Sequence, residues 1–520
     1  MPRIAHGASV TPEQLQQAQE ALASKIADIG FGFAAAASAP EERFGFMFPD
    51  LQRPADRLPT SSATVRRLKE LGRTMVEDAD PPVGNAEELP ATYTYFGQFI
   101  DHDITLEKTS FTTPQLIKDD LRPLSLEQIR ALTNQRSATL DLDSVYGPDS
   151  VKSGDRMVLG KNARSGGLPP GMGTDNDLPR LGTSSDPTKD RAARIGDPRN
   201  DENLIISQLH VAFLKAHNRL VDQGKTFGQA RQILCQHYQH MVLVDFLLRR
   251  IGDKQVVDDV LRNGNRFYHP EPDSFFLPLE FTVAAFRFGH TMVRAEYDYN
   301  LNFSPASLDL LFTFTALSGQ LGGNKTLPEN WIIQWRRFIA QDGGNNPARK
   351  LDTTITRELF SLRKITGQVE GNPALKDKND AANLAVRNLL RGYALRMPTG
   401  QAVARKMEDS QVSVEMLTPA ELLTVAKKSG NSEQEKALKD GNFHNRTPLW
   451  YYLLAEAKHH GKGNRLGPVG SRIVAEVLAH LVRRSEDSIL QVPNWIPTLP
   501  QAHPNVFTVA DLLRFAKVVP

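Results

Sequence analysis

The helical spacing of apolar residues constrains the fold of this chain more than any other feature. In two segments, one central and one near the end, apolar residues return every three or four positions: Ile206, Leu209, Phe213 and Leu220, and then Val474, Val477, Leu478 and Leu481. Runs that alternate apolar and polar residues, as half-buried strands do, are scarce. The sequence therefore predicts a mainly α fold with little β-structure.

The chain is long enough for several domains, but its sequence favours one large helical unit. Its 520 residues are 40% hydrophobic, which suffices for a substantial core. Prolines are frequent in residues 1–90, and long periodic stretches are few there, so we expect an N-terminal arm that packs on the body. No linker divides the rest into self-sufficient halves. We expect residues 91–520 to form one domain, a single structural unit with the arm.

Charge and cysteine content exclude several classes of protein. Lys and Arg number 62 against 60 Asp and Glu, so the net charge of +2 gives no electrostatic reason to expect a nucleic-acid or membrane partner. Cys235 is the only cysteine, which excludes an intrachain disulfide and any site built from four cysteines. No His-Glu-x-x-His or Cys-x-x-Cys spacing is present, so zinc is a poor candidate.

The sequence contains no evident targeting segment. The N-terminus never builds the apolar core of a signal peptide. No window approaches the ~18 continuous apolar residues of a membrane span. We expect a protein without a transmembrane segment, cytoplasmic by default, with leaderless secretion left open.

The segment 95–103 groups polar side chains on an otherwise apolar helix. Gln98, Asp101 and His102 stand at i, i+3 and i+4, so they share one face. Such a face needs a polar ligand or cavity, although a satisfied core histidine beside two acids would leave the same pattern. Asp103 points about 100° away and must serve another neighbour.

Three further segments carry candidate residues. Oxygen-bearing side chains occupy every second position from 137 to 143 and suit a hard cation such as Ca²⁺, although Asp-x-Asp is also common in turns and caps. Arg199 and Glu202 open a helix that Asp197 or Asn200 could cap, or form only a local ion pair. His290 shares a helical face with Phe286 and Val293, where a lone histidine is usually structural: the candidates are thus His290, Arg199, Glu202, Ser137, Thr139, Asp141 and Asp143.

Together and in this order, the four segments resemble the animal haem peroxidases of the peroxidase–cyclooxygenase superfamily. The resemblance covers roughly residues 90–395 and is diffuse at both ends. It implies a single helical haem-peroxidase domain, with His102 as distal histidine and Gln98 as its hydrogen-bonding partner. It further implies that Arg199 is the distal arginine and that His290 binds the haem iron.

The resemblance also implies a calcium ion and a set of residues that hold haem b. The calcium shell would comprise Asp103, Ser137, Thr139, Asp141 and Asp143, with Thr139 contributing its carbonyl. Asn388, which follows Leu384-Ala385-Val386-Arg387, would hydrogen-bond His290. The family's Asp-His-Gly signature is absent after it. Asp101 and Glu202 match the acids that form ester links to haem, and Arg287 is a further cofactor-binding candidate.

The implied reaction is the reduction of hydrogen peroxide by a small anionic or phenolic reductant through a ferryl haem. His102 would move the peroxide proton, and Arg199 would offer positive charge to the breaking bond. Asn203 replaces a methionine that would give a sulfonium link, so we expect bromide, iodide, thiocyanate or phenols rather than chloride. A role in the response to oxidative stress would fit this reaction. The sequence leaves the oligomeric state open.

Two alternatives remain within the resemblance. A fatty-acid dioxygenase of the same superfamily needs a tyrosine three residues before the proximal histidine, where this chain has Arg287. A non-catalytic haem-binding protein would need no distal machinery, and the presence of His102, Arg199 and His290 together disfavours it.

Overall fold

The computed structural model describes residues 42–77, 80, 89–107, 111, 113–271, 274–339, 346–360, 380–429 and 432–519. Most of these residues lie in helices and loops, which confirms the predicted mainly α fold. The longer helices are α2 (Ser62–Thr74), α3 (Thr92–Ile104), α7 (Leu204–Asp222), α8 (Phe227–His240), α9 (Lys254–Asn263), α14 (Leu384–Ala394), α15 (Gly400–Asp409), α16 (Pro419–Lys428), α17 (Ser432–Asp440), α18 (Leu449–His459), α19 (Pro468–Arg484) and α20 (Val509–Phe515).

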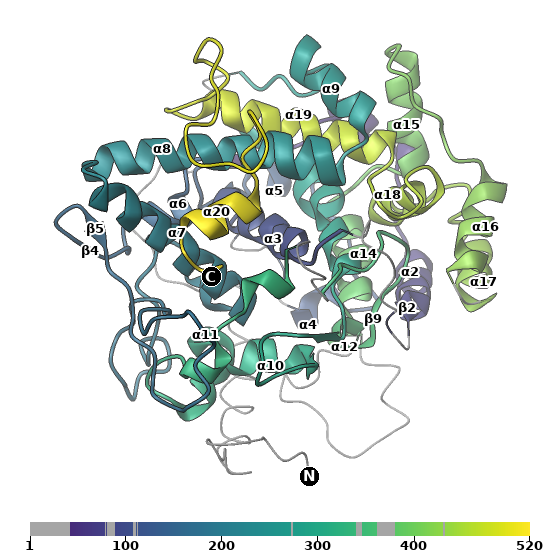
Figure 1. The fold of residues 1–520 in the computed structure, drawn as a ribbon. Helices are drawn as coiled ribbons and strands as arrows, with labels where there is room; N and C mark the ends of the chain where they lie inside the picture. Colours follow the sequence, from purple (N-terminus) through teal and green to yellow (C-terminus); the bar gives the residue numbers. More distant parts are fainter. Residues whose placement is uncertain are drawn as a thin grey trace.

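Helix α3 lies in the interior of this array (Figure 1). It contacts α7, the π-helix η4 (Met241–Ile251) and the 3-10 helix η7 (Ala285–Met292). Three of its aromatic and aliphatic side chains, those of Phe96, Phe99 and Ile100, are completely buried. Phe99 stacks on Phe213 of α7 with ring centroids 4.8 Å apart. This packing fixes the helix that carries Gln98, Asp101 and His102.

Helix α7 begins directly after Asn203, whose side chain caps it. The side chain of Asn203 accepts a hydrogen bond from the backbone N–H of Ile206, at 3.1 Å. The preceding segment, η3 (Pro198–Asp201), is a 3-10 turn whose cap is Asp197. Asn200 therefore caps neither helix, which leaves its amide available for another partner.

The segment that carries His290 differs from the expected α-helix. A short π-helix, η6 (Glu280–Ala284), is followed directly by η7. Phe286, His290 and Val293 nevertheless all line one cavity. The three residues meet there through this irregular backbone and not through regular α-helical spacing.

The strands are short and pair in small sheets. The largest sheet has the order β3-β1-β6, in which β1 (Glu42–Gly45) runs antiparallel to β3 (Thr133–Asn134) and parallel to β6 (Phe276–Pro278). The other pairs are β2 (Val76–Glu77) with β9 (Ile355–Thr356), β4 (Lys152–Ser153) with β5 (Arg156–Met157), and β7 (Glu296–Tyr297) with β8 (Ala306–Ser307).

The described part of the predicted arm contacts the body. Glu280 accepts hydrogen bonds from the backbone N–H groups of Met47 and Phe48, at 2.9 and 3.1 Å. Helix α2 packs on α14, and β1 pairs with strands of the body. Residues 1–41, 78–79 and 81–88 lie outside the described residues, so the boundary at residue 90 stays a prediction.

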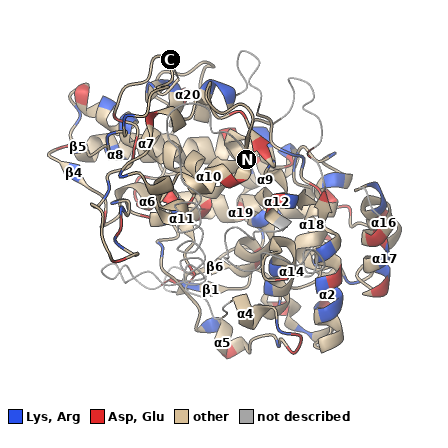
Figure 2. Cartoon of the chain, turned by 90° about the horizontal axis from the view of Figure 1, so that it is seen from below, with Lys and Arg blue, Asp and Glu red and all other residues tan. Residues whose placement is uncertain are grey.

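Basic and acidic side chains are interspersed over the elements seen from below in Figure 2, for example on α2, α16 and α17. None of the described helices combines the length and apolarity that crossing a lipid bilayer requires.

Candidate active site

Both candidate histidines line the same cavity, whose volume is about 390 Å³. His102 faces it from α3 and His290 from η7. The lining also includes four other predicted site residues, Gln98, Asp101, Glu202 and Arg287. Most of the remaining wall is apolar: Phe286, Phe288, Val293, Leu308, Leu311, Phe312, Leu317, Leu359 and Leu384. An apolar cavity of this size with a few convergent polar groups is typical of a cofactor site.

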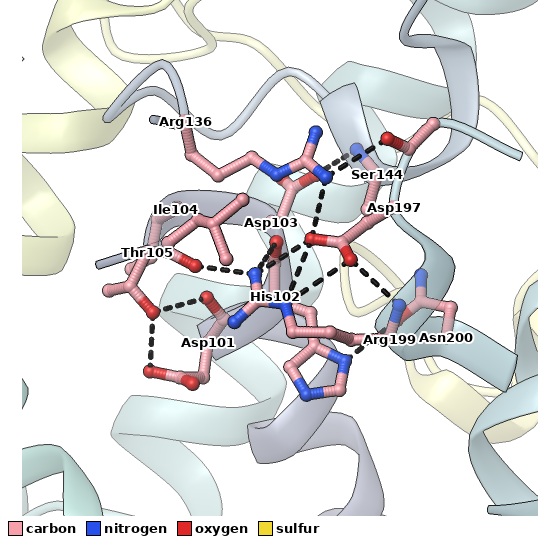
Figure 3. Close-up of polar contacts among 12 residues, drawn as sticks. Asp101, His102, Asp103, Ile104, Thr105, Arg136, Ser144, Asp197, Arg199 and Asn200 are labelled. Carbon is pink, nitrogen blue, oxygen red and sulfur yellow. Dashed lines mark hydrogen bonds and ion pairs between the residues drawn. The ribbon is translucent and has the colours of Figure 1, made fainter. Parts of the chain in front are cut away.

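A buried amide fixes the tautomer of His102. Its Nδ1 atom lies 2.9 Å from Oδ1 of Asn200 (Figure 3). Because an amide oxygen only accepts, Nδ1 carries the ring proton and Nε2 is left as the basic nitrogen. The other end of the Asn200 amide lies 3.1 Å from Nδ1 of His210. Burial lowers the pKa of His210 to about 3, so that ring stays neutral and accepts the bond.

Gln98 and Glu202 form a polar pair beside His102. Gln98 Nε2 donates to Oε1 of Glu202 at 3.0 Å, and Asn203 Nδ2 donates to Oε1 of Gln98 at 3.2 Å. The second oxygen of Glu202 lies 4.0 Å from Nε2 of His102. Glu202 is therefore more than the partner of a local ion pair, since it meets the distal helix inside the cavity.

Asp101 lines the cavity from the same helical face as His102. Its carboxylate and its backbone carbonyl both accept from the Thr105 hydroxyl, at 3.0 and 2.9 Å. Two acids, Asp101 and Glu202, thus border the space between the histidine-bearing segments.

Arg199 lies elsewhere than expected. It is absent from the described residues that line the cavity. Its Nη2 atom donates to the carbonyl of His102 at 3.0 Å and to the carboxylate of Asp197 at 2.7 Å, and it also contacts the carbonyl of Thr105. The guanidinium therefore joins the end of α3 to Asp197 (Figure 3).

In the Arg199–Asp197 ion pair, Asp197 is buried and Arg199 is partly exposed. Burial alone would raise the pKa of Asp197, but the charges of Arg199 and Arg136 hold it below its ordinary value. Burial likewise opposes the charge of Arg199, and Asp197 outweighs it and raises the pKa of the guanidinium. Both groups remain charged behind His102.

His290 is held by an amide, as the resemblance implies. Nδ2 of Asn388 lies 2.8 Å from Nδ1 of His290. Oδ1 of Asn388 accepts from Nη1 of Arg287 at 3.0 Å. Burial, together with the charges of Arg287 and Arg387, lowers the pKa of His290 to about 3. The ring is therefore neutral, which is the form that binds a metal.

Asp103 points away from the cavity toward the loop that carries the other predicted calcium ligands. Its two carboxylate oxygens accept from the backbone N–H groups of Ser144, at 2.9 Å, and Leu142, at 3.3 Å. Burial and the nearby Asp143 raise the pKa of Asp103 to about 7. A cation there would relieve this accumulation of negative charge.

The loop oxygens contact one another. The Ser137 hydroxyl donates to the carboxylate of Asp143, and the Thr139 hydroxyl lies 3.2 Å from Ser137 Oγ. The carbonyl of Asp141 accepts from the buried thiol of Cys235 at 3.1 Å. Within the described part of the chain, no three His, Cys, Asp or Glu side chains are grouped closely enough to hold a metal ion.

Sequence reasoning missed two residues that organise the site. Asn200 was expected only as a possible helix cap, yet it orients His102. Asp197 caps η3 and also pairs with Arg199. Their positions beside Arg199 were the only sequence signal, and short polar residues before a helix have caps as their usual role.

Comparison with known proteins relates this geometry to one family. The family model described as animal haem peroxidase matches residues 112–368. A peroxidase-like protein of Margaritifera margaritifera is 27% identical over 39% of this chain and 32% of its own length. Heme peroxidase 2 of Caenorhabditis elegans is 25% identical over 52% of this chain and 44% of its own. The chain thus spans less than half the length of these curated relatives.

A solved structure shares the fold across most of the chain. Peroxidase A from Dictyostelium discoideum superposes with a TM-score of 0.56 at 16% identity, covering 86% of this chain and 89% of the other. The matched family model, the peroxidase relatives and the shared fold agree with one another. The chain belongs to the animal haem peroxidase superfamily, whose cofactor is haem.

Proposed function

We propose that this chain is a peroxidase that reduces hydrogen peroxide and oxidises a small anionic or phenolic reductant. The observation that carries the proposal is that His102 and His290, from segments distant in sequence, line one largely apolar cavity. Haem, when bound, would supply the redox-active iron that passes electrons from the reductant to peroxide.

The residues present suit a haem. The cavity is walled by aromatic and aliphatic side chains, and His290, which lines it, is neutral. A histidine that binds iron through Nε2 carries its proton on Nδ1 and donates it to an acceptor. Asn388 would then present its oxygen, so the amide must turn from its contact with Arg287. His290 would hold the iron, with Asn388 and Arg287 as its supports.

On the distal side, His102 would move the proton. With Nδ1 held by Asn200, Nε2 takes the proton from the first oxygen of peroxide and returns it to the second, so that water leaves. Gln98 and Glu202 would orient the peroxide through hydrogen bonds. The apolar wall excludes bulk water and so strengthens each of these interactions.

Arg199 would act on this site through position and charge. Its guanidinium holds the His102 carbonyl and is itself held by Asp197. The direct contact with peroxide that the resemblance implies requires the side chain to leave Asp197. We therefore propose that Arg199 fixes the end of α3 and adds positive charge behind the distal base.

The preferred reductants would be bromide, iodide, thiocyanate or phenols. Asn203 lines the cavity beside Glu202, where a methionine would permit a sulfonium link. Without that link we expect little oxidation of chloride near neutral pH. Asp101 and Glu202, both at the cavity wall, would be the sites of any ester link to haem b.

A structural calcium ion would complete the site. The ligands we propose are Asp103, Ser137, Thr139, Asp141 and Asp143. The contacts among Ser137, Thr139 and Asp143, and the position of buried Asp103 next to them, support this set. Because Asp103 follows His102 directly, the ion would stabilise the distal helix from behind.

We also propose that residues 1–90 form an arm and residues 91–520 the catalytic unit. The hydrogen bonds from Met47 and Phe48 to Glu280 support the packing of this arm on the catalytic unit.

The test of the proposed function is haem reconstitution followed by stopped-flow mixing with hydrogen peroxide. We expect hydrogen peroxide to shift the Soret band on mixing. Iodide, added afterwards, should restore the Soret band of the starting protein. A Soret band that peroxide leaves unchanged would favour a non-catalytic haem protein. Oxygen uptake with linoleate, and no reaction with peroxide and iodide, would favour a dioxygenase.

A further inference from the structure

Tyr93, at the start of α3, lies between two cavities. It lines the cavity of about 390 Å³ that contains both histidines. It also lines a second cavity, of about 120 Å³. Ala502 and His503, in the wall of the second cavity, are exposed, so this cavity reaches the molecular surface.

The Tyr93 hydroxyl has a buried carboxylate as its partner. It lies 2.9 and 2.8 Å from the two oxygens of Asp245, which has no exposed surface. One of these oxygens also accepts from the backbone N–H of Val509, at 3.0 Å. Burial raises the pKa of Asp245, which makes this carboxylate readier to hold a proton. Tyr95, which also lines the larger cavity, instead packs on Tyr297.

The second cavity is lined by positive charge. Arg249, Arg250 and Arg514 contribute to its wall, and none of the described lining residues is acidic. Arg514 is paired with Asp511 at 2.7 Å. Arg250 lies over the Tyr93 ring at 5.2 Å, and its Nε forms a longer ion pair with Asp245, at 3.9 Å. Such a wall favours a small anion.

We propose that the second cavity binds a small anionic phenol and that Tyr93 relays its electrons to the haem cavity. The inference rests on the proposed peroxidase function, which supplies the oxidant, hydrogen peroxide. The volume of about 120 Å³ suits one aromatic ring. A carboxylate on that ring would meet Arg249, and the phenol would lie toward Tyr93.

Electrons and protons are conserved in each step of the proposed relay. Tyr93 would give one electron toward the haem cavity, where hydrogen peroxide is the final oxidant, and its hydroxyl proton would move to Asp245, which would leave Tyr93 as a neutral phenoxyl radical. The bound phenol then gives one electron to Tyr93, and Asp245 returns the proton to the Tyr93 oxygen. The phenol loses its own proton to solvent and departs as a radical. Two such cycles supply the two electrons that convert one hydrogen peroxide and two protons into two waters.

The first experiment compares substrates in Tyr93→Phe, which keeps the ring and removes the proton. We expect kcat/KM for 4-hydroxybenzoate to fall by about tenfold or more relative to kcat/KM for iodide in the same variant, because iodide is small enough to enter the haem cavity directly. Freeze-quench electron paramagnetic resonance after peroxide should show a tyrosyl signal in the wild type that is lost in this variant. An unchanged 4-hydroxybenzoate rate and an unchanged radical signal would overturn the relay.

The second experiment tests the binding pocket without turnover. Ligand-detected NMR on the haem-free protein should show 4-hydroxybenzoate binding that Arg249→Gln weakens about tenfold, because a charge-assisted contact is lost. Arg262→Gln, at an exposed ion pair on α9, is the matched control and should bind as the wild type does. Equal binding by all three proteins would overturn the anion pocket. If the wild type oxidises neither iodide nor 4-hydroxybenzoate, the proposed function itself fails, and the pocket is judged by binding alone.

Discussion

Replacing Asn200 tests whether its side chain fixes the tautomer of His102, the proposed distal base. Asn200→Leu keeps a similar volume and removes both the oxygen 2.9 Å from Nδ1 of His102 and the nitrogen 3.1 Å from His210. Asn200 is completely buried and His102 is 4% exposed, so water does not replace the lost partner. His102 must then either bury an unpaired N–H or adopt the tautomer whose Nε2 cannot accept a proton.

The size of the effect follows from the lost bond. A buried polar group without a partner costs about 1–3 kcal/mol. Since about 1.4 kcal/mol is a tenfold change in rate, the reaction of the haem protein with peroxide should slow by roughly 5-fold to 140-fold. His102→Ala removes the base itself and should slow this step by about 10²-fold or more.

The assay is the second-order rate of the Soret change in stopped-flow mixing with peroxide. Asn200→Asp keeps an acceptor for Nδ1 and should restore most of the rate. His210→Phe removes only the far partner of the amide and should have the smaller effect. A rate for Asn200→Leu within twofold of the wild type, with an unaltered ferric spectrum, would refute the tautomer argument.

Three other perturbations address the rest of the structure. Asn388→Leu removes the 2.8 Å contact to His290 and should weaken haem retention about 10-fold to 100-fold, measured by transfer of haem to an acceptor protein. Calcium chelation should lower the melting temperature and loosen the haem pocket in the wild type, and should do neither in Asp143→Ala; equal responses would contradict the proposed ligand set. Burial raises the pKa of Glu456 from 4.5 to about 8, so the folding stability that this group contributes is present below pH 4.5 and is lost as pH rises to about 8; Glu456→Gln, which does not titrate, should lack this part of the fall in melting temperature between pH 5 and pH 9.

Side chains fixed by regular helical spacing were predicted well from the sequence. Gln98, Asp101 and His102 share a face of α3 and do line one cavity. The apolar residues spaced over 206–220 and 474–481 likewise lie on the helices α7 and α19. In these segments local periodicity and tertiary packing agree.

Features set by tertiary contacts were not predictable in this way. The backbone around His290 is a π-helix followed by a 3-10 helix, which periodicity does not distinguish from an α-helix. The Arg199 side chain could point into the cavity or toward Asp197, and it pairs with Asp197. Sequence spacing does not encode which of these two directions the side chain takes. The bond from Asn200 to His102 joins residues 98 positions apart, and only the packing of α3 near η3 brings them together.

The central claim is that one haem lies between His102 and His290. Its most direct test is the absorption spectrum of the reconstituted protein before and after one equivalent of hydrogen peroxide, recorded for the wild type, His290→Ala and His102→Ala. We predict a ferric spectrum with histidine ligation that His290→Ala loses and His102→Ala keeps, and a peroxide response that His102→Ala slows. A His290→Ala protein that binds haem with the wild-type spectrum would contradict the account.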